Sequence, residues 1–145
     1  MGRILAIDLG TKRVGIAMSD PTLTIAQPFK TIIFSNIKTF VQDLLEIAKS
    51  YEIEMIIIGF PLTMKGKFSE KTTEVKNIFE EVKSRIPIPM ELYDERLTTI
   101  LAHNTMHQLD MKPSKERDKV DQLAAMHLLQ NYLDSKSRSE NLKNI

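Results

Sequence analysis

The sequence predicts an α/β protein in which a mixed β-sheet is covered by helices on both faces. Two observations lead to this fold class. The chain opens with three short apolar runs separated by turn residues, which is typical of strands joined by hairpins. Farther along, short apolar runs alternate with segments whose apolar residues recur every three or four positions. Strands that alternate with helices are joined by crossovers, so the later strands should be parallel.

Three strands are expected before residue 35. Arg3–Asp8 is apolar enough to lie centrally in a sheet, and Leu9–Arg13 is a Gly-centred turn that leads into a second strand, Val14–Met18. Ser19–Pro21 marks the next turn, and Ile25–Phe34 returns as the third strand, with Pro28 near its start. The first two strands are expected to form a β-hairpin.

Helices and strands alternate over the rest of the chain. The first is a helix capped by Ser35 or Asn36, with an apolar face from Ile37 to Ala48, and the strand Met55–Ile58 follows it. Next come a helix capped by Ser69, with an apolar face from Val75 to Val82, and the strand Ile88–Tyr93. The last two elements are the helices Thr98–Leu109 and Asp118–Leu133. Residues 1–134 then form one domain. Residues 135–145 are polar and are expected to be a disordered tail.

Composition excludes several classes of protein. The chain has 145 residues, with 20 Lys and Arg against 19 Asp and Glu, so it does not hold nucleic acid by bulk basicity. It has no cysteine, which excludes disulfides, thiolate metal sites and cysteine nucleophiles. The longest apolar stretch, Met55–Leu62, is far too short to span a membrane, and the start of the chain does not read as a secretory signal. The expected location is the cytoplasm, with no membrane partner.

Acidic residues stand at the ends of predicted elements. Asp8 ends the first strand, Asp94 and Glu95 end the last strand, and Asp121 lies near the start of the final helix. In α/β sheets, reactive groups gather at the carboxyl ends of strands. Carboxylates that converge there would suit Mg²⁺ or Mn²⁺. A purely structural interpretation of each acid stays open, since turns, helix N-termini and the capping pair of Asp118 with Asp121 all use Asp or Glu.

The turn from Gly10 to Gly15 carries Lys12 and Arg13 beside Asp8. It is not a P-loop, which needs Lys after the second Gly, and it lacks the spacing of a dinucleotide-binding loop. It is either a phosphate-binding turn next to a metal ligand or a hairpin tip with solvated charges.

Four segments, taken together and in this order, resemble the motifs of the RuvX (YqgF) family of the ribonuclease H-like superfamily. They are Ile7–Ala17, Ile58–Leu62 with Gly66, Asp94–Thr99 with Ala102, and Lys119–Leu133. The resemblance covers residues 3–134. The loop Leu62–Gly66 departs from it, because Lys65 stands where the family more often has an acid or amide.

This resemblance implies a ribonuclease H-like fold with a five-stranded mixed sheet whose second strand is antiparallel. It also implies a catalytic and metal-binding triad, which falls on Asp8, Glu95 and Asp121. Asp94 and Asp118 are the alternatives at the third and fourth motifs. The implied cofactor is a divalent cation, Mg²⁺ or Mn²⁺, and the implied reaction is hydrolysis of a phosphodiester.

The substrate expected from the resemblance is nucleic acid, held through its backbone. The basic residues expected to hold it are Lys12, Arg13, Lys115, Arg117 and Lys119, together with Arg96, which alternatively pairs with a triad carboxylate. We favour 5′-end processing of pre-16S ribosomal RNA, with contacts on the maturing ribosome.

Three alternatives to that function stay open. The first is Holliday junction resolution, which calls for a symmetric dimer that the sequence does not announce. The second is a non-catalytic nucleic-acid or protein binding module. The third is a nucleotide-binding domain of the actin-like superfamily, whose members open with a similar strand and turn but use two such domains.

Overall fold

The computed structural model describes residues 2–10, 12–60, 70–94 and 117–143, and the predicted α/β fold class is confirmed. Its elements are β1 (Arg3–Leu9), β2 (Arg13–Ser19), β3 (Ala26–Ile33), α1 (Ile37–Tyr51), β4 (Ile53–Phe60), α2 (Glu70–Lys83), β5 (Met90–Asp94) and α4 (Arg117–Lys143). The strands and helices predicted within these ranges are all found; their ends differ by a few residues, except at the C-terminal end of α4. The predicted helix Thr98–Leu109 and the predicted cap Ser69 lie outside the described residues.

The five strands form one mixed sheet in the order β3-β2-β1-β4-β5. β2 is antiparallel to both β1 and β3, whereas β4 is parallel to β1 and β5 is parallel to β4. This is the predicted sheet, antiparallel second strand included. β3 is an edge strand, which explains why it accommodates Pro28, a residue that donates no backbone hydrogen bond.

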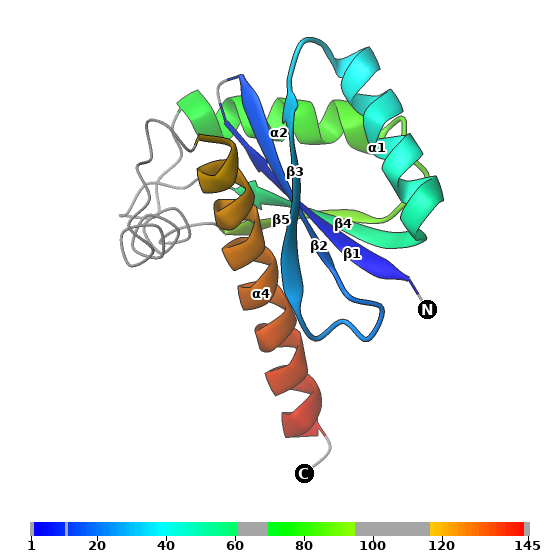
Figure 1. Ribbon diagram of the computed structural model, residues 1–145, viewed down its shortest axis with the longest axis vertical. Helices are drawn as coiled ribbons and strands as arrows, with labels where there is room; N and C mark the ends of the chain where they lie inside the picture. Colours follow the sequence, from blue (N-terminus) through cyan, green and yellow to red (C-terminus); the bar gives the residue numbers. More distant parts are fainter. Residues whose placement is uncertain (1, 11, 61–69, 95–116, 144–145) are drawn as a thin grey trace.

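One face of the sheet packs against α1 and α2 (Figure 1). Branched and aromatic side chains fill this core. Its fully buried members include Leu5, Ile7, Val14, Ile16, Phe40, Leu44, Ile56 and Ile58. The cap of α1 is as predicted: the side chain of Asn36 accepts a hydrogen bond of 2.8 Å from the backbone N–H of Thr39.

The other face of the sheet packs against α4, which crosses β1, β2 and β3 (Figure 1). Several of the strand residues beneath the helix are small. Ala6, Ala17 and Ala26 face it, and α4 contributes Ala125, Leu128 and Leu129 to the same core. Helices are thus present on both faces of the sheet, as the sequence predicted. Alanine on both partners lets the helix approach the sheet closely at these positions.

α4 continues to Lys143, well past the predicted end at Leu133, so residues 135–143, predicted as a disordered tail, are helical. Two contacts support the added turns: Tyr93 Oη lies 3.5 Å from Ser135 Oγ, and Lys136 Nζ lies 5.4 Å from the ring centre of Tyr132. The sequence beyond residue 113 also contains neither Gly nor Pro, so nothing in it stops a helix. None of the helices within the described ranges, α4 included, is both long and apolar enough to cross a membrane.

Candidate active site

Asp8 lies on the face of the sheet that α4 covers. Side chains alternate along β1, and Ile4 and Ala6 both belong to the core under α4. Asp8 continues that row and is half-buried. Its partner in the neighbouring strand is Gly15, and directly paired residues of antiparallel strands present their side chains to the same face. The carboxylate of Asp8 is therefore set beside a residue that has no side chain.

α4 packs directly against Gly15 of β2. A Cβ atom added to Gly15 would lie 2.0 Å from the backbone oxygen of Asp121 and 2.9 Å from its Cβ. Any side chain at position 15 would therefore push α4 away from the sheet. Because Gly15 is paired with Asp8, this close approach brings Asp121 to the strand position beside Asp8. Two acids more than a hundred residues apart in the chain are thus brought to one place.

Arg13 completes this group. It opens β2 on the same face as Gly15, and its Nε lies 3.4 Å from Asp121 Oδ2. Both of these atoms are shielded from solvent, although the side chains as wholes are 32% and 24% exposed. From its place on a Gly-rich turn, Arg13 is predicted to bind phosphate, and pairing with a carboxylate is predicted only for Arg96. Side chains alternate between the two faces along β2, so Arg13 shares a face with Gly15. This alternation is the sequence signal that could have placed Arg13 on the face that α4 covers.

Two glutamines of α4 fix the helix on the edge strand. Gln122, the residue after Asp121, donates a 3.2 Å hydrogen bond from Nε2 to Thr31 Oγ1. Farther along, Gln130 Oε1 accepts from the N–H of Ala26 at 2.9 Å, and Gln130 Nε2 donates to the carbonyl of Thr24 at 3.0 Å. These bonds set the lateral position of α4, and with it that of Asp121. Both glutamines lie in the segment Lys119–Leu133 that resembles the family's last motif, but no role for them is predicted from the sequence.

The predicted basic residues divide into two groups. Lys12 is exposed in the β1–β2 turn, where its carbonyl accepts a 2.8 Å hydrogen bond from the N–H of Phe34. Lys119 is exposed on α4, two residues before Asp121. Both cations lie close in sequence to a residue of the Arg13 and Asp121 pair. Arg117 is the first residue of α4, while Arg96 and Lys115 lie outside the described residues.

The third predicted acid, Glu95, also lies outside the described residues. Its alternative, Asp94, is the last residue of β5. The alternative to Asp121, Asp118, is in the first turn of α4. Tyr93, two residues before Glu95, faces α4, with its ring centre 5.4 Å from that of Tyr132. β5 is thus joined to the same helix that carries Asp121.

Two further titratable groups of α4 have shifted pKa values. Burial raises the pKa of Tyr132 to about 12, and the negative charge of Glu91 adds to this shift, so the phenol is protonated at pH 7. The hydroxyl of Tyr132 lies 3.3 Å from Met55 Sδ. Burial lowers the pKa of His127 below its ordinary value of 6.5, which keeps the imidazole neutral at pH 7. We assign neither residue a role in the reaction, in keeping with the sequence analysis.

The donor set suits a hard divalent cation. Asp8 and Asp121 are half-buried carboxylates, and oxygen ligands of this kind are the ones that Mg²⁺ and Mn²⁺ prefer. Within the described part of the chain, no three Asp, Glu, His or Cys residues are grouped so that they could hold a metal. The remaining predicted ligand, Glu95, lies outside the described residues.

Solved structures with the same fold include Holliday junction resolvases. The yeast mitochondrial resolvase Ydc2 superposes with a TM-score of 0.60 at 11% identity, over 99% of this chain and 82% of that one. The RuvC protein of Thermus thermophilus, solved with a Holliday junction substrate, gives a TM-score of 0.55 at 13% identity, over 94% of this chain and 96% of RuvC. At these identities the likeness establishes the fold alone, and this fold is the predicted ribonuclease H-like one.

Sequence relatives are much closer. A protein of Sulfurihydrogenibium sp. is 40% identical over 99% of this chain and 98% of its own, and one of Roseiflexus sp. is 38% identical over 92% and 95%. Both carry the name of pre-16S rRNA nuclease. The sequence profile of the RuvX family, described as Holliday junction resolvase, matches residues 2–135. Nuclease activity is common to both descriptions, which confirms the predicted class of enzyme. The chain therefore belongs to the RuvX family of nucleases.

Proposed function

We propose that this nuclease depends on a divalent metal and trims the 5′ end of pre-16S ribosomal RNA. The observation that carries the proposal is the meeting of Asp8 and Asp121 at Gly15. A pair of half-buried carboxylates at the end of a central strand is costly unless a cation offsets their charge. A site that gathers them there is suited to binding a metal ion and, through it, a phosphate.

The metal would be Mg²⁺ or Mn²⁺, held by Asp8, Asp121 and Glu95. When bound, such ions lower the pKa of water and stabilise the charge that develops on a phosphodiester. Asp8 and Asp121 would orient the site, because β1 fixes the first and the packing of α4 against Gly15 fixes the second. Asp94 remains the alternative to Glu95, and Asp118 remains the alternative to Asp121.

The exposed cations near the acids would bind the nucleic-acid backbone. Lys12 on the turn and Lys119 on α4 are both exposed, so their ammonium groups can reach a phosphate without desolvation of the protein interior. Arg96, Lys115 and Arg117 belong to the same proposed set. Contacts to phosphates position the substrate but carry no sequence information, so selection of the cleavage site rests on other features.

The choice of RNA rests on the relatives at 35–40% identity, whose name is pre-16S rRNA nuclease. The runner-up is Holliday junction resolution, which the description of the family profile favours. The proposed partners are precursor RNA and the maturing ribosome. The proposed location is the cytoplasm, a reducing compartment that suits a chain without cysteine.

The test is a side-by-side cleavage assay with two substrates, a pre-16S RNA 5′ leader and a four-way DNA junction. Each is incubated with the full chain in Mg²⁺, in Mn²⁺ and in chelator. We expect metal-dependent cleavage of the RNA that Asp8→Asn abolishes, with no change in the melting temperature large enough to explain the loss. Cleavage of the junction alone would replace the proposed substrate with the runner-up. Equal RNA cleavage in chelator would contradict the metal requirement.

A further inference from the structure

The contact between Arg13 and Asp121 does not look like a substrate-binding arrangement. Arg13 Nε is turned toward the protein and lies 3.4 Å from Asp121 Oδ2, and solvent reaches neither atom. This separation is longer than the 2.7–2.9 Å or so of a charge-assisted hydrogen bond. The contact is therefore a charge interaction in which the carboxylate is not locked by a short bond at this atom.

The surroundings of Asp121 explain why a cation is needed there. α4 is packed so tightly on Gly15 that the backbone of Asp121 lies directly against β2. Asp8, the strand partner of Gly15, presents a second carboxylate to the same face. Two partly desolvated carboxylates on one face concentrate negative charge there. A guanidinium, which stays charged at any ordinary pH, counteracts this.

We propose that Arg13 is the resident counter-ion of Asp121 and a positioning residue of the site. It holds the carboxylate in place while no metal is bound, and its charge opposes the entry of a divalent cation. Metal binding and the Arg13–Asp121 contact therefore compete. This inference rests on the proposed function, because it takes Asp8 and Asp121 as metal ligands.

The first readout is the affinity of the full chain for Mn²⁺ alone, measured by titration calorimetry without nucleic acid. Arg13→Gln should bind Mn²⁺ about tenfold more tightly than the parent, the order expected when one unit charge near a divalent ion is removed under near-aqueous screening. Arg13→Lys keeps the charge and should stay within about threefold of the parent by the same reasoning. If Arg13 only stabilised the fold, Arg13→Gln would not bind Mn²⁺ more tightly than Arg13→Lys.

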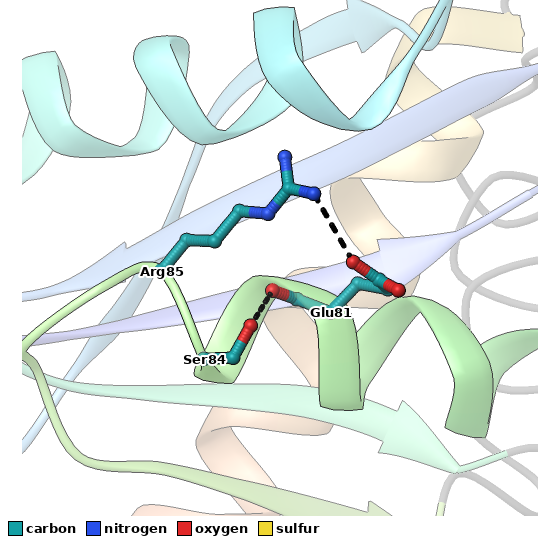
Figure 2. Close-up of polar contacts among 3 residues, drawn as sticks. All are labelled: Glu81, Ser84 and Arg85. Carbon is teal, nitrogen blue, oxygen red and sulfur yellow. Dashed lines mark hydrogen bonds and ion pairs between the residues drawn. The ribbon is translucent and has the colours of Figure 1, made fainter.

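The chain offers a matched control. Arg85 donates a 3.2 Å bond to Glu81, four residues earlier, in an exposed ion pair beside the C-terminal end of α2 (Figure 2). α2 packs on the opposite face of the sheet from α4. Arg85→Gln makes the same chemical change away from the acids, so it should leave Mn²⁺ affinity unchanged. Tighter binding in this control would show that the gain in Arg13→Gln reflects net charge alone, and would overturn the inference.

The second readout is the melting temperature with and without saturating Mn²⁺. Arg13→Gln should melt below the parent without metal, and Mn²⁺ should raise its melting temperature more than it raises that of the parent. Equal or weaker Mn²⁺ binding by Arg13→Gln would overturn the role of Arg13 while leaving the metal site intact. If the parent binds no Mn²⁺, or if Asp8→Asn and Asp121→Asn bind it as the parent does, the proposed function fails as well.

Discussion

The two faces of the sheet are built from the same strands but packed in opposite ways. Toward α1 and α2, β1 and β2 present Leu5, Ile7, Val14 and Ile16, all fully buried. Toward α4, β1 presents Ile4, Ala6 and Asp8, and β2 presents Arg13, Gly15 and Ala17. One face is a layer of large aliphatic side chains. The other has small residues at its centre, with a carboxylate and a guanidinium at one end.

This difference shows how one sheet can serve both stability and chemistry. Large apolar side chains contribute burial free energy, roughly 25 cal/mol for each Å² removed from water, so the α1 and α2 face contributes more to folding. Small residues give up some of that contribution, but they let α4 approach close enough for Asp121 to reach the end of β1. Changes on the first face should therefore act on stability, and changes on the second on activity.

The largest effect on stability should come from Leu44→Ala on α1. Leu44 is fully buried in the core between α1 and the sheet, so its truncation should lower the free energy of unfolding by about 2–5 kcal/mol. Urea unfolding measures the loss. The cleavage rate per folded molecule should not change, because Leu44 lies on the face opposite Asp8. Leu45→Ala is the matched control: Leu45 is 38% exposed, and we expect a loss of at most about 0.5–1 kcal/mol.

Gly15→Ala should have a smaller effect on stability and a much larger one on activity. The added methyl would meet the backbone oxygen of Asp121, so α4 has to move, at a cost of about 1–3 kcal/mol. Displacement of Asp121 by about 1 Å should also slow cleavage about a hundredfold. Denaturant unfolding and the cleavage rate are measured on the same preparation.

Gly2→Ala is the corresponding control at the far end of β1. Its added methyl would meet the Cβ of Glu54 at 2.6 Å, away from both acids. This variant should lose stability but keep the parent's rate per folded molecule. A hundredfold loss of cleavage in Gly2→Ala, or parent-like cleavage in Gly15→Ala, would remove the distinction between the two faces.

The smallest effect concerns Asp20, in the β2–β3 loop outside both cores. Backbone N–H groups of Ile25 and Thr24 and the hydroxyl of Thr22 donate to its carboxylate and hold its pKa well below the ordinary value of 3.8. A lowered folded-state pKa means that the contribution to stability is present above that ordinary value and is lost as the pH falls below it. The stability difference between the parent and Asp20→Asn should therefore shrink from pH 7 to about pH 3. A constant difference would contradict this account of the loop.

Most of the fold could be predicted because local pattern and tertiary packing agree. The apolar spacing of α1 and its Asn36 cap are local signals, and both are found in the structure. The end of α4 could not be predicted in this way. Residues after Leu133 have no apolar face, and their helical state draws on the contact between Ser135 and Tyr93, which comes from a distant strand.

The site could be predicted in part. Asp8 and Asp121 were singled out because they stand at element ends, and the structure brings them together through Gly15, a contact that no local pattern encodes. The pairing of Arg13 with Asp121 was missed because a cation on a Gly-rich turn suggested a phosphate partner. Glu95, Arg96 and Lys115 lie outside the described residues, so their roles stay predictions.

The central claim is that Asp8 and Asp121 act as one unit, and a double-mutant cycle on metal-dependent RNA cleavage tests it most directly. The parent is compared with Asp8→Asn, Asp121→Asn and the double variant. Each single change should slow cleavage about a thousandfold, because a bound metal contributes several kcal/mol to the transition state. The double variant should then be no slower than either single one, since residues that serve one metal site are strongly non-additive. Losses that multiply in the double variant, or a single variant as fast as the parent, would contradict the claim.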